Sequence, residues 1–265
     1  MKKINVIKVG GGIVEDTDSL SQLLADFSQL SGHKVLVHGG GRSATKIAAS
    51  LGIESQMVEG RRITDEKMLQ VVTMVYGGLV NKNLVAGLQA YGVNALGLTG
   101  ADINIIRSHK RPTKCVTLAD GTKQMIDFGF VGDVDCVDGH MLSTLVQQSV
   151  VPVIAPLTHD GKGNLLNTNA DTIASEVACA LASFFEVTLT FCFEKPGVLR
   201  NADDDSSVIP HISEKDFHQL TQSGIVAGGM IPKLKNAFQA IRQGVKKVVI
   251  TRANHLDGKG GTVIE

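Results

Sequence analysis

Short apolar runs alternate with amphipathic stretches from the N-terminus onward. Residues 4–9 and 34–37 are apolar and rich in β-branched side chains, so each is predicted to form a buried strand. Between them, residues 16–30 place leucine and phenylalanine at helical spacing, and residues 42–51 predict a second helix. A strand, a helix and a strand in this order predict a parallel sheet with right-handed crossovers.

The same rhythm continues to the C-terminus, except over residues 104–134, where polar and apolar side chains alternate. We predict that this stretch leaves the main sheet as a β-rich flap, with Asp120-Gly121 as a hairpin turn. No linker rich in Pro, Gly or Ser divides the chain, so residues 1–265 are predicted to form a single α/β domain. The other predicted elements are a long helix at 64–91, helices at 170–184, 213–223 and 230–243, and strands at 95–98, 150–155, 187–191, 247–251 and 261–264.

Composition narrows the function classes. Basic and acidic side chains are balanced, 26 of each, which argues against a protein that binds nucleic acid or a membrane surface. The N-terminus lacks a signal-peptide pattern, and no apolar run approaches the roughly 20 residues that span a bilayer. We therefore expect a cytoplasmic protein, whose four widely spaced cysteines are reduced thiols: Cys115, Cys136, Cys179 and Cys192.

The 29 glycines are clustered rather than spread, and two clusters follow predicted strands directly. Lys8 lies inside the first strand and is followed by Gly10 to Gly12, while Gly39 to Gly41 follow the second strand. A lysine in an apolar strand is costly to bury, so we expect its ammonium group to face an anion at the strand's carboxyl end. Successive glycine N–H groups beside it can approach phosphate oxygens closely.

Two further segments combine polar residues with a predicted helix start. Asn167 to Asp171 precede one helix, and three polar side chains in five positions exceed what a single helix cap requires. Gly228-Gly229 precede another helix, whose first turn contains Lys233. Together with the glycine turns, these segments indicate phosphoryl transfer between two bound anions. They contain neither a Rossmann fingerprint nor a P-loop.

The chain resembles the acetylglutamate kinase family of the amino acid kinase superfamily. The resemblance covers nearly the whole length, in family order. It lies in KVGGG (8–12), VHGGGRSA (37–44), EGRRIT (59–64), VYGGLVNKNL (75–84), GFVGDV (129–134), VPVIAPL (151–157), NTNAD (167–171) and GGMIPKL (228–234).

The resemblance implies a carbamate-kinase-like fold, a three-layer α/β structure with an open, mainly parallel, eight-stranded sheet between helices. It further implies an N-lobe, residues 1–166, that binds the acylglutamate and makes dimer contacts. Residues 167–265 would form a C-lobe that binds ATP. The implied reaction is ATP-dependent phosphorylation of the γ-carboxylate of N-acetyl-L-glutamate in arginine biosynthesis.

The resemblance also assigns roles by position. Lys8 and Lys233 would contact the transferring phosphoryl group, and Asp171 would hold both ammonium groups in place. Arg62 would bind the substrate's α-carboxylate, with Arg61 a solvated neighbour. Other substrate-binding residues would be Gly40, Gly41, Asn167 and Asn169; phosphate-binding residues would be Gly11, Gly12 and Gly40; nucleotide-binding residues would be Glu194, Gly197, Gly229, Met230 and Lys233.

Magnesium would arrive with ATP, because the sequence shows no carboxylate cage for a metal of its own. The segment from Phe193 to Val198 departs from the family's nucleotide motif, in which Thr or Ser and then Asp come before Gly-Val; Glu194 would replace the aspartate. The chain begins directly with its first strand, and the tail from His255 to Thr262 only loosely resembles an arginine-site signature. We therefore expect a homodimer without arginine inhibition.

Three alternatives remain open. The substrate could be N-succinyl-L-glutamate, the chain could be another amino acid kinase, or it could be a non-catalytic amino-acid sensor on the same fold. A sensor would have no use for two phosphoryl-facing lysines with Asp171, whereas a kinase requires them.

Overall fold

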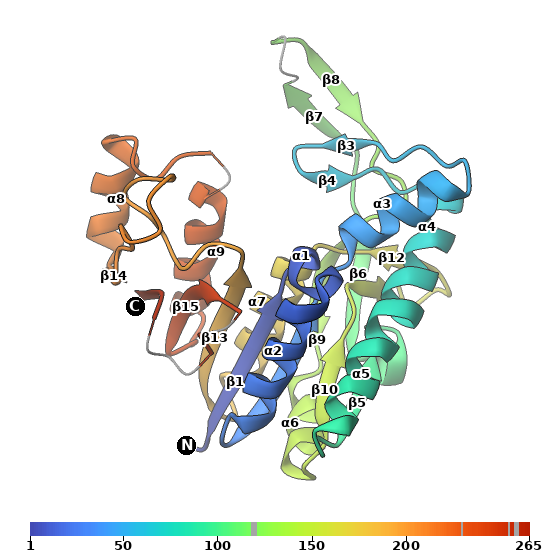
Figure 1. Cartoon of the computed structure of the whole chain (residues 1–265). Helices are drawn as coiled ribbons and strands as arrows, with labels where there is room; N and C mark the ends of the chain where they lie inside the picture. The colour runs from blue at the N-terminus through green and yellow to red at the C-terminus, as the bar shows by residue number, and fades with distance from the viewer. Residues whose placement is uncertain (118–120, 229, 254, 257–259) are drawn as a thin grey trace.

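The computed structural model describes residues 1–117, 121–228, 230–253, 255–256 and 260–265. At its centre is the predicted eight-stranded, mainly parallel sheet (Figure 1). Only the edge formed by β16 and β14 reverses direction, because β16 is antiparallel to β15 and β14 is parallel to β16. In spatial order the strands are β14 (His211–Ile212), β16 (Thr262–Ile264), β15 (Lys247–Arg252), β13 (Glu186–Phe193), β1 (Lys3–Val9), β2 (His33–His38), β10 (Val151–Ile154) and β5 (Ala95–Leu98).

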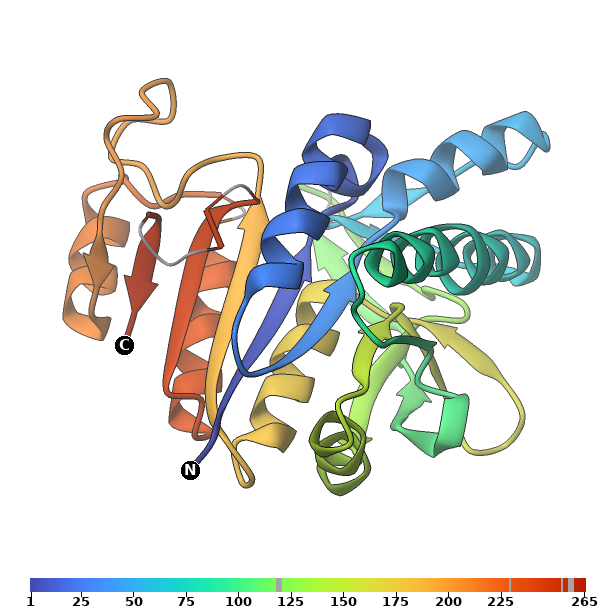
Figure 2. The same cartoon turned by 60° about the horizontal axis from the view of Figure 1, so that its bottom comes forward.

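Helices cover both faces of this sheet, which confirms the predicted three layers (Figure 2). Alternation along β1 separates the two cores: Val6 packs with one hydrophobic cluster and Ile7 with the other. The cluster around Ile7 includes side chains of α1 (Gly11–Glu15), α2 (Thr17–Gln29), α3 (Gly41–Ser50), α4 (Glu66–Val72), a π-helical stretch (Thr73–Val80) and α5 (Asn81–Ala90). The cluster around Val6 includes side chains of α6 (Gly139–Gln147), α7 (Ala170–Leu181), α8 (Glu214–Gln222) and α9 (Met230–Arg242).

The predicted long helix runs without a break from Glu66 to Ala90. By length and composition alone it could cross a membrane, which the sequence pattern did not suggest. Many of its apolar side chains, among them Val72 and Leu84, lie in the core against the sheet, whereas Met74 and Leu79 are exposed. A core helix of a soluble protein meets the same criteria, so these criteria alone do not place the helix in a membrane.

The predicted β-rich flap is confirmed, but only part of it projects from the body. A hairpin of β7 (Lys114–Thr117) and β8 (Lys123–Ile126) stands out beside a second hairpin of β3 (Met57–Val58) and β4 (Arg61–Arg62) (Figure 1). The rest joins a four-stranded sheet in the order β12 (Leu165–Asn167), β11 (Leu157–His159), β6 (Ile106–Lys110) and β9 (Gly132–Val137), with a short 3-10 turn (Asp102–Asn104) before it. The predicted turn at Asp120-Gly121 falls partly outside the described residues, because Asp120 is not among them.

Candidate active site

The two glycine turns lie against each other at the carboxyl edge of the sheet. They follow β1 and β2, which are parallel neighbours in the sheet, so both turns leave the same edge. A Cβ atom on Gly11 would lie 3.6 Å from the backbone nitrogens of both Gly40 and Gly41. A Cβ atom on Gly39 would lie 3.3 Å from the nitrogen of Gly11. Because side chains would separate the turns, glycine allows their N–H groups to converge on one place.

Lys8 and Asp171 form an ion pair beside the first turn. The ammonium nitrogen of Lys8 lies 2.8 Å from Oδ1 of Asp171, and the two side chains are 9% and 23% exposed. The Asp171 carboxylate is fixed by its place in the first turn of α7. The Asn169 side chain caps this helix, because it accepts hydrogen bonds from the N–H groups of Asp171 (2.9 Å) and Thr172 (3.1 Å). The polar segment is therefore a helix cap as well as a carrier of Asp171.

Lys233, in the first turn of α9, reaches the same place from the other side. Its Nζ lies 3.5 Å from the centroid of the Phe193 ring, and that of Lys8 lies 5.2 Å from the same ring. Burial is the main cause that lowers the pKa of Lys233; the charge of Lys8 adds to this, whereas Asp171 opposes it. The structure therefore brings together the three residues predicted to be catalytic.

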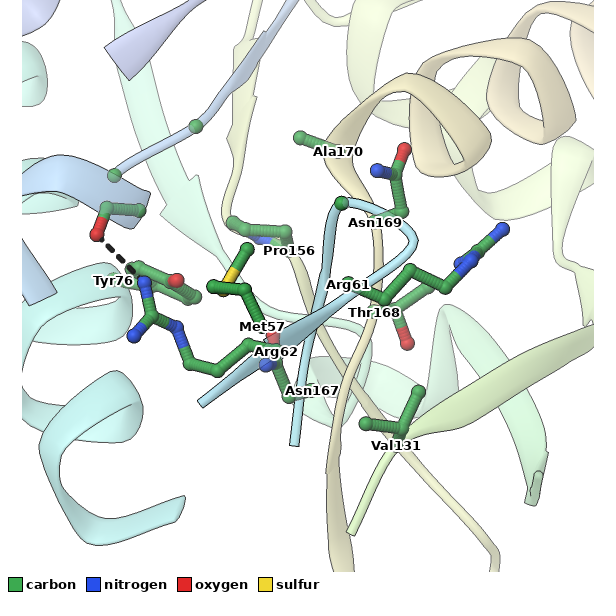
Figure 3. Close-up of a pocket in the computed structure, with 14 residues that line it drawn as sticks. Met57, Arg61, Arg62, Tyr76, Val131, Pro156, Asn167, Thr168, Asn169 and Ala170 are labelled. Atoms are coloured by element: carbon green, nitrogen blue, oxygen red, sulfur yellow. Dashed lines mark hydrogen bonds between the residues drawn. The ribbon is translucent and has the colours of Figure 1, made fainter. Parts of the chain in front are cut away.

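A cavity with about 630 Å³ of open space lies next to this centre (Figure 3). It extends from the second glycine turn to the start of α7 and is roofed by the β3–β4 hairpin. Its lining residues are Gly39, Gly40, Gly41, Met57, Gly60, Arg61, Arg62, Tyr76, Val131, Pro156, Asn167, Thr168, Asn169 and Ala170. All five residues predicted to bind the substrate, namely Gly40, Gly41, Arg62, Asn167 and Asn169, are among them.

Arg62 is 7% exposed and is held at one end of the cavity. Its Nη2 donates to the carbonyl oxygen of Gly41 at 2.9 Å (dashed line in Figure 3) and to Oγ1 of Thr45 at 2.8 Å. Its Nη1 is buried without a hydrogen-bond partner in the part of the chain that is described. A buried guanidinium nitrogen without an acceptor favours a bound anion, because an unsatisfied charged donor is costly.

Tyr76 was not singled out in the sequence. Its ring packs on Gly40, whose Cβ, if present, would lie 2.8 Å from Cδ1 of the ring. Burial raises the pKa of the Tyr76 hydroxyl, and the nearby Arg62 partly opposes this. Tyr76 is one of only two tyrosines in the chain and directly precedes Gly77-Gly78. This pattern alone does not reveal that its ring contacts a turn distant in the sequence.

The prediction that Arg61 is a solvated neighbour is wrong. Arg61 is partly buried and lines the cavity, and its side chain extends toward the opposite end from Arg62 (Figure 3). Burial is the main cause that lowers the pKa of Arg61, and the charge of Arg111 adds to it, whereas Asp133 and Glu59 oppose it. Among the described residues it forms no ion pair, whereas Arg111 pairs with Asp133.

Asn167 is buried at the end of β12. Its Nδ2 donates to Oγ1 of Thr64 at 3.0 Å, which fixes the amide and leaves Oδ1 as its acceptor. His38, at the end of β2, is fully buried; its Nδ1 lies 2.8 Å from the Gly39 carbonyl oxygen and its Nε2 lies 3.1 Å from Nδ2 of Asn81. Burial lowers the pKa of His38 to about 4, so this histidine is neutral at pH 7.

The residues predicted to bind nucleotide are more dispersed. Glu194 forms an exposed ion pair with Arg42 at 2.8 Å, directly over the first glycine turn, where Gly12 leaves room for both side chains. Gly197 is buried against Thr262 and does not line the cavity. Met230 begins α9, and Gly229 lies outside the described residues.

Among the described residues, no group of three or more His, Cys, Asp or Glu side chains is placed to hold a metal ion. The donors gathered at the site are instead ammonium, guanidinium and backbone N–H groups. Such donors bind anions, and phosphate oxygens and carboxylates in particular.

A family model of the amino acid kinase family matches residues 3–252, and the chain belongs to this family. Solved structures agree in fold. A protein of Streptococcus mutans superposes with a TM-score of 0.77 at 27% identity, covering 98% of each chain. A carbamate kinase of Giardia superposes with a TM-score of 0.65 at 16% identity, covering 99% of this chain and 98% of the other.

Within this family, the chain belongs to the acetylglutamate kinases. The acetylglutamate kinase of Bacteroides fragilis is 63% identical over 264 residues, which cover 100% of this chain and 97% of the relative. That of Cytophaga hutchinsonii is 53% identical, covering 97% of this chain and 94% of the relative. That of the archaeal Methanopyrus kandleri is 39% identical, covering 98% of this chain and 100% of the relative.

Proposed function

We propose that this chain transfers the γ-phosphoryl group of ATP to the γ-carboxylate of N-acetyl-L-glutamate, forming an acyl phosphate in arginine biosynthesis. Its membership of the acetylglutamate kinases supports this function. The structural observation that carries it is the ion pair of Lys8 and Asp171, with Lys233 facing it, at the mouth of two touching glycine turns.

The proposed chemistry needs positioning rather than a base. A γ-carboxylate is already ionised at pH 7 and can attack the γ-phosphorus directly. As its oxygen bonds to phosphorus, the bond to the β-phosphate oxygen breaks and ADP leaves with the electron pair. Lys8 and Lys233 would stabilise the charge on the transferring oxygens, while N–H groups of Gly11, Gly12 and Gly40 bind the same group.

The cavity would orient the amino acid. Arg62 would bind the α-carboxylate through its buried Nη1, and Oδ1 of Asn167 would accept a hydrogen bond from the acylated nitrogen. Gly40 and Gly41 would contact the γ-carboxylate, and Asn169 would bound the cavity on the α7 side. The reacting carboxylate would then face Lys8.

Residues 167–265 would bind ATP and residues 1–166 the amino acid. Glu194, Gly197, Gly229, Met230 and Lys233 would line the nucleotide side. Magnesium would enter with the phosphates. ATP would thus approach Lys233 while the amino acid occupies the cavity beside Arg62.

We further propose that the protein is a cytoplasmic homodimer. The long helix exposes Met74 (55%) and Leu79 (50%), and the edge strand β5, against which α5 packs, exposes Leu96 (39%). A second copy placed over this apolar surface would cover both the helix and the open strand edge.

Arg61 favours N-succinyl-L-glutamate as a second candidate substrate. A succinyl group ends in a third carboxylate, and the partly buried Arg61 guanidinium lies at the other end of the cavity from Arg62 without an ion-pair partner among the described residues. An acetyl group would bring no carboxylate to this guanidinium.

Trapping of the acyl phosphate with hydroxylamine separates these possibilities. The enzyme is supplied with MgATP and, separately, N-acetyl-L-glutamate, N-succinyl-L-glutamate and L-glutamate. Hydroxamate from acetylglutamate supports the first proposal. Turnover mainly on succinylglutamate, lost selectively in Arg61→Ala, supports the second, and no hydroxamate from any acceptor contradicts both.

A further inference from the structure

One aromatic ring faces both lysines of the proposed transfer centre. Phe193 is the last residue of β13, and its ring lies 3.5 Å from Nζ of Lys233 and 5.2 Å from Nζ of Lys8. Lys8 and Phe191 are paired in register on neighbouring strands, and Phe193 lies two residues further along, on the same face. Phe193 is therefore carried by the sheet to the place where the ammonium groups meet.

The charges around the ring explain why an aromatic residue matters here. Two ammonium groups face a single carboxylate, Asp171, which forms its ion pair with Lys8. No carboxylate in the described part of the chain lies within ion-pair distance of Lys233. The titratable groups that act on Lys233 are Lys8 from β1, which repels it, and Asp171 from α7, which attracts it. The negative face of an aromatic ring supplies attraction without adding a charge.

We propose that Phe193 is a positioning residue, which holds Lys233 at the transfer centre through a cation–π contact. This inference rests on the proposed kinase function. A carboxylate in the place of the ring would bind Lys233 strongly and compete with the phosphoryl group. A ring attracts the ammonium group more weakly, so Lys233 is held in position before ATP arrives and is free to bind phosphate oxygens afterwards.

Phe191 provides a matched control within the same strand. The two phenylalanine rings stack at 6.1 Å with an interplanar angle of 8°, and Phe191 is 5% exposed in the core. Phe193 makes a cation–π contact with each of the two lysines, whereas Phe191 makes none with the described residues. Phe191 also lines a small pocket with Phe193 and Lys233, so its loss can disturb the contact only indirectly. A role in packing alone would affect both positions to a similar degree, whereas a role in holding Lys233 would affect Phe193 much more than Phe191.

The test compares Phe193→Leu, Phe193→Tyr and Phe191→Leu with the wild type. We expect Phe193→Leu to lower kcat/KM for ATP by about 10-fold, in line with the strength of such contacts. Phe193→Tyr keeps a ring and should restore most of this loss. Phe191→Leu should lower the midpoint of urea unfolding at least as much as Phe193→Leu, but should lower kcat/KM for ATP clearly less.

A second readout does not depend on turnover. The pH dependence of Lys233 labelling by an amine-reactive reagent, followed by mass spectrometry, gives its pKa in each variant. Loss of the ring should lower the pKa of Lys233 further in Phe193→Leu and much less in Phe191→Leu. In Phe193→Tyr the pKa should be close to that of the wild type. Equal behaviour of the two leucine variants in both readouts would overturn the role of Phe193. A wild type that labels as expected but forms no acyl phosphate would overturn the proposed function instead.

Discussion

The ammonium group of Lys8 lies 2.8 Å from the carboxylate of Asp171, although 163 positions separate the two residues in the sequence. Lys8 comes from the central strand β1 and Asp171 from the first turn of α7, which packs on that strand. The pair fixes a cation at the sheet edge where both glycine turns begin. The proposed transfer centre is built around this contact.

Replacing Asp171 with asparagine should separate charge from shape. The variant would leave the buried ammonium group of Lys8 and the half-buried one of Lys233 without a carboxylate, so we expect a loss of about 3 kcal/mol in the free energy of unfolding. Lys8 would also lose its orientation, and kcat should fall by roughly 100-fold or more. Urea unfolding and steady-state kinetics measure the two effects. The control is Asp135→Asn, which breaks an exposed pair with His109. It should change the free energy of unfolding and kcat only slightly.

Deprotonation of Lys233 should cause the pH–activity profile to fall on its alkaline side (the alkaline limb). Its pKa lies below the usual 10.5 because of burial, so the ammonium group loses its proton at a lower pH than a free lysine. Activity that requires this charge should fall over that range. Lys233→Arg keeps a charge that does not titrate, so it should retain part of the activity and shift the limb to higher pH. An unchanged limb in Lys233→Arg would assign it to another group.

The same pKa shift predicts a change in stability with pH. Between the lowered pKa of folded Lys233 and 10.5, the unfolded chain binds more protons than the folded one. The free energy of unfolding contributed by this residue therefore rises as pH increases through that window. Lys233→Met should remove this contribution, which urea unfolding at several alkaline pH values would reveal by comparison with the wild type.

Truncation of Arg62 should act on the amino acid and spare the nucleotide. Arg62→Ala removes the buried donor proposed for the α-carboxylate, and we expect KM for the acylglutamate to rise about 100-fold, equivalent to about 2.7 kcal/mol. KM for ATP should change little. A comparable rise in KM for ATP would mean that the variant disturbs the glycine turn through its contact with Gly41 rather than the substrate contact.

Lys34 offers a test of stability away from chemistry. Its buried Nζ donates to three carbonyl oxygens, those of Phe27, Ser28 and Leu30, at the end of α2. Lys34→Met should lower the free energy of unfolding by about 2 kcal/mol, because the helix end loses its donor. We expect kcat to stay unchanged at a temperature where the variant is folded. A kcat loss there would show that α2 is coupled to the site.

Much of the site could be predicted because parallel strands share an edge. Once β1 and β2 were identified as neighbouring parallel strands, Lys8 and both glycine turns had to lie together. Asp171 and Lys233 were found because each opens a helix after a distinctive polar or glycine-rich segment. The convergence of Lys8 and Lys233 on Phe193 could not be predicted, because an apolar residue in a strand gives no sign of which side chain its ring will meet.

The β3–β4 hairpin over the cavity was not predicted, and the surroundings of Arg61 were predicted wrongly, for a different reason. Arg61 and Arg62 lie in a two-residue strand, which is too short to produce a pattern of alternation. The adjacent Arg61 and Arg62 extend in opposite directions there, so their unequal environments depend on tertiary contacts. The short strands β11 and β12, which carry and pair Asn167, and the helix α1, which begins at Gly11, were also not predicted. Neither was α6.

Direct observation of the acyl phosphate is the most decisive measurement. Wild-type enzyme is mixed with MgATP and N-acetyl-L-glutamate, and ³¹P NMR follows the products, with Lys8→Met run beside it. We expect an acyl-phosphate signal that grows with ADP in the wild type and is absent or at least 100-fold slower in Lys8→Met. ADP and inorganic phosphate without an acyl phosphate, or equal rates in both proteins, would contradict this expectation.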